Sequence, residues 1–360
     1  MGQAVLAVHV HAGRLEFRRF RLVAVTVGAD DHQIADLRAV RSGALLGLPT
    51  ETVYGLAADA SSDAAVAQIF AAKGRPSDHP LIVHVADAAG IAHFASDVPA
   101  FAQKLVDAYW PGPLTLILPR LPGVATAATG GQDSVGLRCP AHPVAHAVLQ
   151  ACAAPGDGPE LGGPPVWGLA APSANRFGRV SPTTAQHVQD ELGEALLVLD
   201  GGPCGVGIES TIVDCTRGVP VLLRPGAITR TQIAAACGIE PLSKEELPAF
   251  TPRASGTLEA HYAPAAKVRL MDAKALQTGL DLLGAEAAHL AVYARAPLRS
   301  ASSRVLLRRM PDDAEATAQQ LFAALRGFDD AGVRLIWIET PPDTPDWEGV
   351  RDRLQRAAAA

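Results

Sequence analysis

Short apolar runs alternate with longer amphipathic stretches along most of this chain. Residues 44–48, 81–85, 114–118 and 196–200 each form such a run, with a length typical of a buried strand. Between the first two runs, Val66, Ile69 and Phe70 recur at helical spacing and give residues 61–73 one apolar face. This alternation of strands and helices predicts an α/β fold.

Capping and turn residues set the limits of the predicted elements. Ser61 or Ser62 caps the helix at 61–73, and Gly74 ends it, because Pro76 cannot continue a helix. Residues 153–165 are rich in Gly and Pro and predict a flexible surface insertion. Before residue 239, the predicted helices span 31–41, 61–73, 99–109, 143–152 and 181–192, and the predicted strands span 44–48, 81–85, 114–118, 134–138, 166–170, 196–200, 211–214 and 219–223.

The pattern changes after residue 238. Residues 239–265 predict a linker that contains His261-Tyr262-Ala263-Pro264 near its end. Beyond it, strands at 268–271, 290–293, 305–307 and 334–339 alternate with helices at 273–283, 313–327 and 346–359, which predicts a partly parallel sheet. We therefore expect an N-terminal extension (1–30), a larger domain (31–238), the linker (239–265) and a smaller domain (266–360) without a catalytic constellation.

Composition narrows the class of protein. A length of 360 residues allows two cores, and a net charge of −6 argues against a main role in coating nucleic acid. The five cysteines include no C-x-x-C pair, so neither a zinc site nor a disulfide framework is predicted. No apolar run approaches the roughly 20 residues that span a bilayer. We therefore expect a cytoplasmic protein with no membrane partner.

Charged and polar residues stand where predicted elements end. Lys73 and Arg75 occupy the corner between the helix at 61–73 and the strand at 81–85. Lys73 in the last helical turn would also complement the helix dipole, for about 0.3–1 kcal/mol, so these cations alone do not establish a site. Thr50, Thr52 and Tyr54 follow the strand at 44–48 and offer three hydroxyl groups, which suits a polar ligand.

Later strand ends carry similar groups. The strict alternation at 134–138 puts Ser134 and Arg138 on one strand face, which lies either in a cleft or at an edge in water. Ser181 begins the helix predicted at 181–192, where free N–H groups bind anions, although an ordinary cap has the same sequence. Residues 201–207 contain four glycines, which would let the backbone approach a phosphate, and Arg224 ends the strand at 219–223.

Three separated motifs carry a resemblance to a known family. They are Thr50-Glu51-Thr52-Val53-Tyr54-Gly55, Lys73-Gly74-Arg75 and Pro172-Ser173-Ala174-Asn175. Together they closely resemble the YrdC-type threonylcarbamoyl-AMP synthases in their long two-domain form, over about residues 31–264 and more loosely to the C-terminus. The resemblance implies a twisted mixed sheet with flanking helices, joined by a linker to a smaller Rossmann-like α/β domain.

The resemblance also implies a reaction. The family makes L-threonylcarbamoyladenylate and pyrophosphate from ATP, L-threonine and bicarbonate, with Mg²⁺ accompanying the nucleotide. Downstream tRNA threonylcarbamoyl transferase proteins then place the threonylcarbamoyl group on a tRNA adenosine next to the anticodon. These proteins are the implied partners, and tRNA itself is at most a transient one.

The family's binding pattern can be carried over to this chain residue by residue. Lys73 and Arg75 would be catalytic, and Tyr262 would close over the nucleotide as the linker crosses the site. The implied ATP-binding residues are Lys73, Arg75, His79, Ser134, Ser173, Asn175, Ser181, Arg224 and Tyr262, with His79 where the family more often has Asn. The implied threonine-binding residues are Thr52, His84, Arg138, Ala171 and Ser210.

Two alternative functions are open at this point. A carbamoyltransferase of hydrogenase maturation contains a similar domain, but this chain lacks the cysteine-rich zinc-finger segments expected beside it. A double-stranded RNA binding module is disfavoured by the negative net charge and by the absence of an aromatic and basic stripe.

Overall fold

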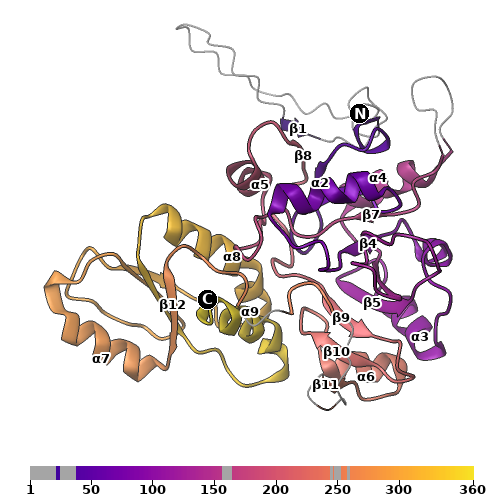
Figure 1. The fold of residues 1–360 in the computed structure, drawn as a ribbon. Helices are drawn as coiled ribbons and strands as arrows, with labels where there is room; N and C mark the ends of the chain where they lie inside the picture. The colour runs from indigo at the N-terminus through magenta and orange to yellow at the C-terminus, as the bar shows by residue number, and fades with distance from the viewer. Residues whose placement is uncertain (1–21, 25–37, 156–163, 244–245, 247–252, 258–259) are drawn as a thin grey trace, which may run out of the picture.

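The computed structural model describes residues 22–24, 38–155, 164–243, 246, 253–257 and 260–360 (Figure 1). The rest of the N-terminal extension, most of the helix predicted at 31–41 and the centre of the insertion at 153–165 lie outside these residues. The described chain folds into a larger unit built on a mixed sheet and a smaller unit built on a parallel sheet. The predicted α/β fold class is thereby confirmed.

The larger sheet has eleven described strands. They are β1 (Leu22–Ala24), β2 (Leu46–Leu48), β3 (Gly55–Asp59), β4 (Ile82–His84), β5 (Leu114–Pro119), β6 (Ser134–Arg138), β7 (Leu169–Ala170), β8 (Leu197–Asp200), β9 (Thr211–Asp214), β10 (Val221–Arg224) and β11 (Leu242–Ser243). Their order in the sheet is β1-β8-β2-β3-β7-β4-β6-β5-β9-β10-β11. Parallel pairs such as β4 with β6 adjoin antiparallel pairs such as β5 with β6.

Side chains alternate between the two faces of this sheet. In β3, Leu56 and Ala58 pack into one core, whereas Ala57 packs into the other. The helices on the first face are α2 (Asp63–Lys73), α3 (Ala100–Tyr109), α5 (Ala185–Leu192) and α6 (Arg230–Cys237), and α4 (Pro143–Ala153) packs on the second. Helix α2 has Ser62 as its N-cap and Gly74, at φ 61°, as its C-cap, as the sequence predicts.

The linker covers the other half of the second face. Ile82, Ile117 and Ile212 form an apolar cluster there, with Leu242 and Ala254 of the linker packed against it. Because β4, β5 and β9 each contribute one of these isoleucines, this cluster fixes the linker over the middle of the sheet. Polar side chains at the ends of the same strands therefore lie beneath the linker.

The smaller unit is a four-stranded parallel sheet with helices on both faces. Its strands are β12 (Lys267–Met271), β13 (Leu290–Ala294), β14 (Leu306–Arg309) and β15 (Leu335–Glu339), in the order β12-β15-β13-β14. Helix α7 (Ala273–Leu283) covers one face, and α8 (Ala314–Asp330) and α9 (Glu348–Ala358) cover the face turned toward the larger unit (Figure 1). No helix in the described ranges is long and apolar enough to cross a membrane.

The two units share one apolar interface. Val53, Val180 and Ile208 of the larger unit pack into the core formed by α8 and α9. Gly207 lies so close to α8 that a Cβ there would overlap the helix backbone at Gln319. Glycines at 201–207 would let the backbone approach a phosphate, but at Gly207 the close approach is to the protein itself.

Candidate active site

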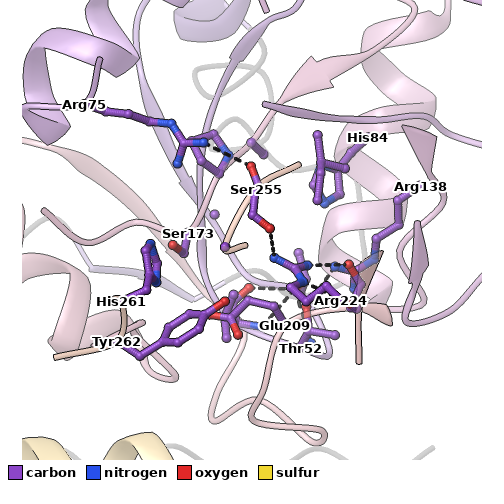
Figure 2. Close-up of a pocket in the computed structure, with 18 residues that line it drawn as sticks. Thr52, Arg75, His84, Arg138, Ser173, Glu209, Arg224, Ser255, His261 and Tyr262 are labelled. Carbon is purple, nitrogen blue, oxygen red and sulfur yellow. Dashed lines mark hydrogen bonds between the residues drawn. The ribbon is translucent and has the colours of Figure 1, made fainter. Parts of the chain in front are cut away.

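A pocket lies on the second face of the larger sheet, beneath the linker (Figure 2). Ile82 and His84 line it, whereas Val83 between them packs into the helix-covered core. The parallel register of β4 and β6 pairs His84 with Arg138.

Arg138 forms a buried cationic corner of the pocket. Its Nη1 donates to the Thr52 hydroxyl at 2.8 Å, its Nη2 lies 2.7 Å from Glu51 Oε1, and its Nε donates to the Gly112 carbonyl at 3.2 Å. Thr52 is held in turn by the Thr50 hydroxyl at 2.9 Å. This network holds the guanidinium in place at the pocket, with Glu51 as its carboxylate partner among the described residues. A planar guanidinium can bind both oxygens of a carboxylate.

His84, beside Arg138, is buried and neutral. Burial, and then the charge of Arg138, lower the pKa of its imidazole to about 3. Among the described residues, its Nδ1 has no hydrogen-bond partner. A neutral imidazole with an unpaired nitrogen at a pocket can exchange a hydrogen bond with a ligand, but it is a weak base at neutral pH.

Two buried arginines meet at Ser255 of the linker. Arg75 Nη2 donates to the Ser255 hydroxyl at 3.2 Å and to the Pro80 carbonyl at 2.9 Å. Arg224 Nη1 donates to the Ser255 carbonyl at 2.9 Å, while its Nε and Nη2 bind the carbonyl and the hydroxyl of Ser210, each at 3.0 Å. Figure 2 shows Ser255 between the two guanidinium groups. Two cations on either side of one pocket suit an anion with several oxygens.

Lys73 is buried at the end of α2, behind one wall of the pocket. Its Nζ donates to the carbonyls of Ser173 at 2.6 Å and Asn175 at 2.5 Å, and Ser173 itself lines the pocket. Burial, and then the charge of Arg75, lower the pKa of Lys73 to about 7. At neutral pH its amine is therefore partly charged, and an anion nearby would favour the charged form.

A carboxylate also lines the pocket. Glu209 accepts hydrogen bonds from the Ser181 hydroxyl and from Arg353 Nε, the latter at 2.7 Å.

Helix α5 begins at Ala185 with Thr184 as its N-cap, so the prediction that Ser181 begins this helix is wrong. The Thr184 hydroxyl closes the first turn, and the Ser181 hydroxyl is directed to Glu209 instead.

The linker forms the last wall with His261 and Tyr262. The Tyr262 backbone has a positive φ of 60°, and its ring stacks on Phe322 of α8 with ring centroids 5.6 Å apart. Burial lowers the pKa of His261 to about 3 and raises the pKa of Tyr262 to about 12, so both side chains are neutral at physiological pH. Within the described part of the chain, the Tyr262 hydroxyl has no hydrogen-bond partner.

The structure brings most of the predicted site residues to this pocket and leaves others outside its lining. His79 packs its ring edge against Phe177, Asn175 gives its amide nitrogen to carbonyls of its own loop, and Ser134 lines an adjoining cavity that also includes Ser255. The predicted residues that line the pocket are Thr52, Arg75, His84, Arg138, Ala171, Ser173, Ser210, Arg224 and Tyr262.

The other lining residues include three polar ones to which the sequence assigned no role: Glu209, Ser255 and His261. The position of Glu209 could have been predicted to matter, because a carboxylate next to a buried strand needs either an ion-pair partner or a ligand. His261 adjoins Tyr262 and lay within a motif already noted. Ser255 had no signal, since it stands in a linker and meets Arg75 across 180 positions of sequence.

Family comparisons cover nearly the whole chain. A family model described as telomere recombination matches residues 38–226, and the model of the threonylcarbamoyl-AMP synthase C-terminal domain matches residues 228–359. The threonylcarbamoyl-AMP synthase of Bacillus subtilis is 37% identical over 350 residues, which cover 92% of this chain and 94% of that protein. The threonylcarbamoyl-AMP synthase of Pyrococcus abyssi is 36% identical, over 89% of this chain and 92% of its own.

A solved structure agrees with this relationship. The crystal structure of P. abyssi Sua5 complexed with L-threonine matches with a TM-score of 0.79 and 34% identity, over 91% of this chain and 94% of that one. A match over 91% of the chain extends over both units. The chain therefore belongs to the threonylcarbamoyl-AMP synthase family, in its long two-domain form.

Proposed function

We propose that this chain makes L-threonylcarbamoyladenylate and pyrophosphate from ATP, L-threonine and bicarbonate. The observation that carries the proposal is a single pocket whose lining includes the buried Arg138 guanidinium together with a pair of cations, Arg75 and Arg224. The names of the relatives support this synthase and neither of the two alternative functions. Its product serves the modification of tRNA next to the anticodon.

We assign the two ends of the pocket to the two larger substrates. Arg138 would bind the threonine carboxylate, with Thr52, Ser210 and the Ala171 backbone around the rest of the amino acid. His84 would orient the threonine amine through its unpaired nitrogen, since a pKa of about 3 makes it a poor acceptor of that amine's proton. The residues assigned to the nucleotide are Lys73, Arg75, Ser173, Arg224 and Tyr262.

The chemistry needs positioning more than a nucleophilic side chain. The threonine amine combines with bicarbonate to give a carbamate and water, and a carbamate oxygen then attacks the α-phosphorus of ATP. The bond between the α-phosphorus and the oxygen that bridges it to the β-phosphorus breaks. Pyrophosphate leaves with the electron pair of that bond. Carbamates decompose readily in water, so the linker's contribution would be to exclude solvent, while Lys73, Arg75 and Arg224 stabilise charge on the phosphates.

We propose that Mg²⁺ enters as part of the substrate, bound to ATP. Within the described ranges, no group of three or more His, Cys, Asp or Glu side chains is arranged to hold a metal ion. Magnesium bound through substrate phosphates and waters needs few protein ligands.

The labile product would pass to tRNA threonylcarbamoyl transferase proteins in the cytoplasm, with tRNA at most a transient partner.

Pyrophosphate release tests the proposed function. The protein is incubated with MgATP and bicarbonate, with and without L-threonine, and pyrophosphate is measured over time. We expect release to depend on threonine and to require bicarbonate. Release that threonine does not increase would refute the synthase, and turnover of carbamoyl phosphate would favour the hydrogenase-related enzyme instead.

Gly256 offers a test of the linker as the cover of this pocket. A Cβ at Gly256 would overlap the Tyr262 hydroxyl and lie 3.0 Å from Arg224 Nη1, and its φ of +72° adds backbone strain. We expect Gly256→Ala to weaken MgATP binding about tenfold, the effect of about 1.4 kcal/mol of displaced contacts. Isothermal titration calorimetry measures the change.

Gly218 provides the matched control for this substitution. It has a φ of +76°, but no atom lies within 4 Å of a Cβ placed there, so Gly218→Ala introduces strain without a clash. We expect this variant to bind MgATP as the wild type does. Equal affinities of both variants and the wild type would show that Gly256 and its neighbours do not take part in nucleotide binding.

A further inference from the structure

Arg353, in the last helix, is a fully buried cation that crosses from the smaller unit into the wall of the pocket. Its side chain is 0% exposed. Nε donates to Glu209 Oε2 at 2.7 Å and Nη2 to the Glu209 carbonyl at 3.1 Å, while Nη1 donates to the Pro225 carbonyl and to Asp352 Oδ2, each at 2.8 Å. Every nitrogen of the guanidinium is thus paired, as burial of a charge requires.

The same guanidinium also contacts the linker. Its central carbon lies 5.2 Å from the centroid of the Tyr262 ring, in a cation–π arrangement. Tyr262 is thereby held between Arg353 of α9 and Phe322 of α8. One side chain of the smaller unit therefore touches two walls of the pocket, the carboxylate Glu209 and the aromatic ring Tyr262.

The position of Glu209 creates an electrostatic problem for a nucleotide site. An unpaired carboxylate in this wall would repel a triphosphate and would attract Arg224 away from it. Burial alone would raise the pKa of Glu209, but Arg353 and Arg224 outweigh it and hold that pKa below its usual range. The other charged or titratable groups that face Glu209 are Lys73 of α2 and His261 and Tyr262 of the linker, while Asp352 of α9 faces Arg353.

We propose that Arg353 is a positioning residue through which the smaller unit controls nucleotide binding: it neutralises Glu209 and fixes Tyr262, so that Arg224 remains available to phosphate. The proposal rests on the proposed function, in which this pocket binds MgATP. It gives the smaller unit a role beyond anchoring the linker. The role is electrostatic, and this distinguishes it from simple support of the fold.

The test compares three variants by titration calorimetry with MgATP from pH 6 to pH 8.5, alongside the wild type, which corrects for titration of the nucleotide itself. In Arg353→Gln the buried Glu209 loses its main partner and its pKa rises. We expect the affinity of this variant to fall about tenfold or more at pH 8 and to recover as the pH is lowered and the carboxylate takes up a proton.

The double variant Arg353→Gln/Glu209→Gln removes both charges of the pair. It should regain most of the lost affinity and lose the added pH dependence, and it serves as the test if the single variant does not fold. Arg351→Gln is the control on the same helix, because Arg351 bonds to Asp343 and to nearby carbonyls but not to Glu209. We expect it to bind as the wild type does.

Two results would overturn the proposal. One is wild-type affinity in Arg353→Gln, and the other is a pH-independent loss of equal size in the single and double variants, which would indicate structural support alone. Threonine-dependent pyrophosphate release by the wild type is measured separately. Its absence, with MgATP still bound, would refute the proposed function without deciding the role of Arg353.

Discussion

Replacing Lys73 with alanine is expected to lower kcat/KM for adenylate formation by about a hundredfold or more. The substitution removes a buried cation from beside the phosphate end of the pocket, and it also releases the Ser173 and Asn175 carbonyls that Nζ holds at 2.6 Å and 2.5 Å. A hydrogen bond to a charged group contributes about 1.5–3 kcal/mol, and about 2.7 kcal/mol corresponds to a hundredfold in rate.

The pKa of Lys73 makes a second consequence measurable. With a pKa near 7, the amine is partly neutral at pH 7.5, and a triphosphate would bind more tightly to its charged form. Binding should therefore take up a proton, and the affinity for MgATP should fall as the pH rises above about 7. Calorimetry in buffers of different ionisation enthalpy measures this proton uptake, which should disappear in Lys73→Met.

Lys104 supplies the control, because it is an exposed lysine of α3 that does not line the pocket. Lys104→Ala should keep both the activity and the proton uptake of the wild type. Thermal unfolding of each variant shows whether the fold is intact. A folded Lys73→Ala protein with full activity would remove Lys73 from the mechanism.

Replacing Arg138 with lysine is expected to raise the KM for threonine about a hundredfold and to change MgATP binding little. Lysine keeps the charge but cannot bond Thr52, Glu51 and the Gly112 carbonyl while presenting a planar face to a carboxylate. A hydrogen bond to a charged group contributes about 1.5–3 kcal/mol, and about 2.7 kcal/mol corresponds to a hundredfold in affinity. The effect should appear in initial rates measured against threonine concentration.

Arg120 is the matched control for this substitution. Its side chain is 8% exposed and bonds to carbonyls of Leu121, Val124 and Gln132, but it does not line the pocket. Arg120→Lys should lower stability without changing the KM for threonine. If both variants raise that KM equally, the threonine assignment of Arg138 is wrong.

Regular local patterns predicted much of the fold. The strict alternation at 134–138 predicted β6 with its observed limits, and the helix expected at 273–283 is observed as α7. Strand β3 went unpredicted, because Gly-Leu-Ala-Ala-Asp has little strand propensity and is held by its neighbours β2 and β7. The start of α5 was predicted wrongly for a related reason. Ser181, Thr183 and Thr184 all carry hydroxyls that can cap a helix, and the structure uses Thr184.

The pocket itself could be predicted only in part. The alternation at 134–138 left Arg138 either in a cleft or at an edge, and the family resemblance supplied the roles of Arg138 and His84. The parallel pairing of β4 with β6 places the two residues side by side. Glu209 and Arg353 are paired across 144 positions, and neither residue alone indicates the other. Contacts of this kind depend on how the two units pack, which no local pattern of hydrophobicity records.

The place of Ser255 between Arg75 and Arg224 bears on how tightly any nucleotide is held. Its hydroxyl and carbonyl occupy donors that a phosphate would also use, so the chain carries an internal competitor tethered at high local concentration. The observed affinity then equals the intrinsic affinity multiplied by the fraction of molecules in which Ser255 does not contact the two arginines. Relatives with identical pocket residues would consequently saturate at different ATP concentrations wherever their linkers differ in length or stiffness.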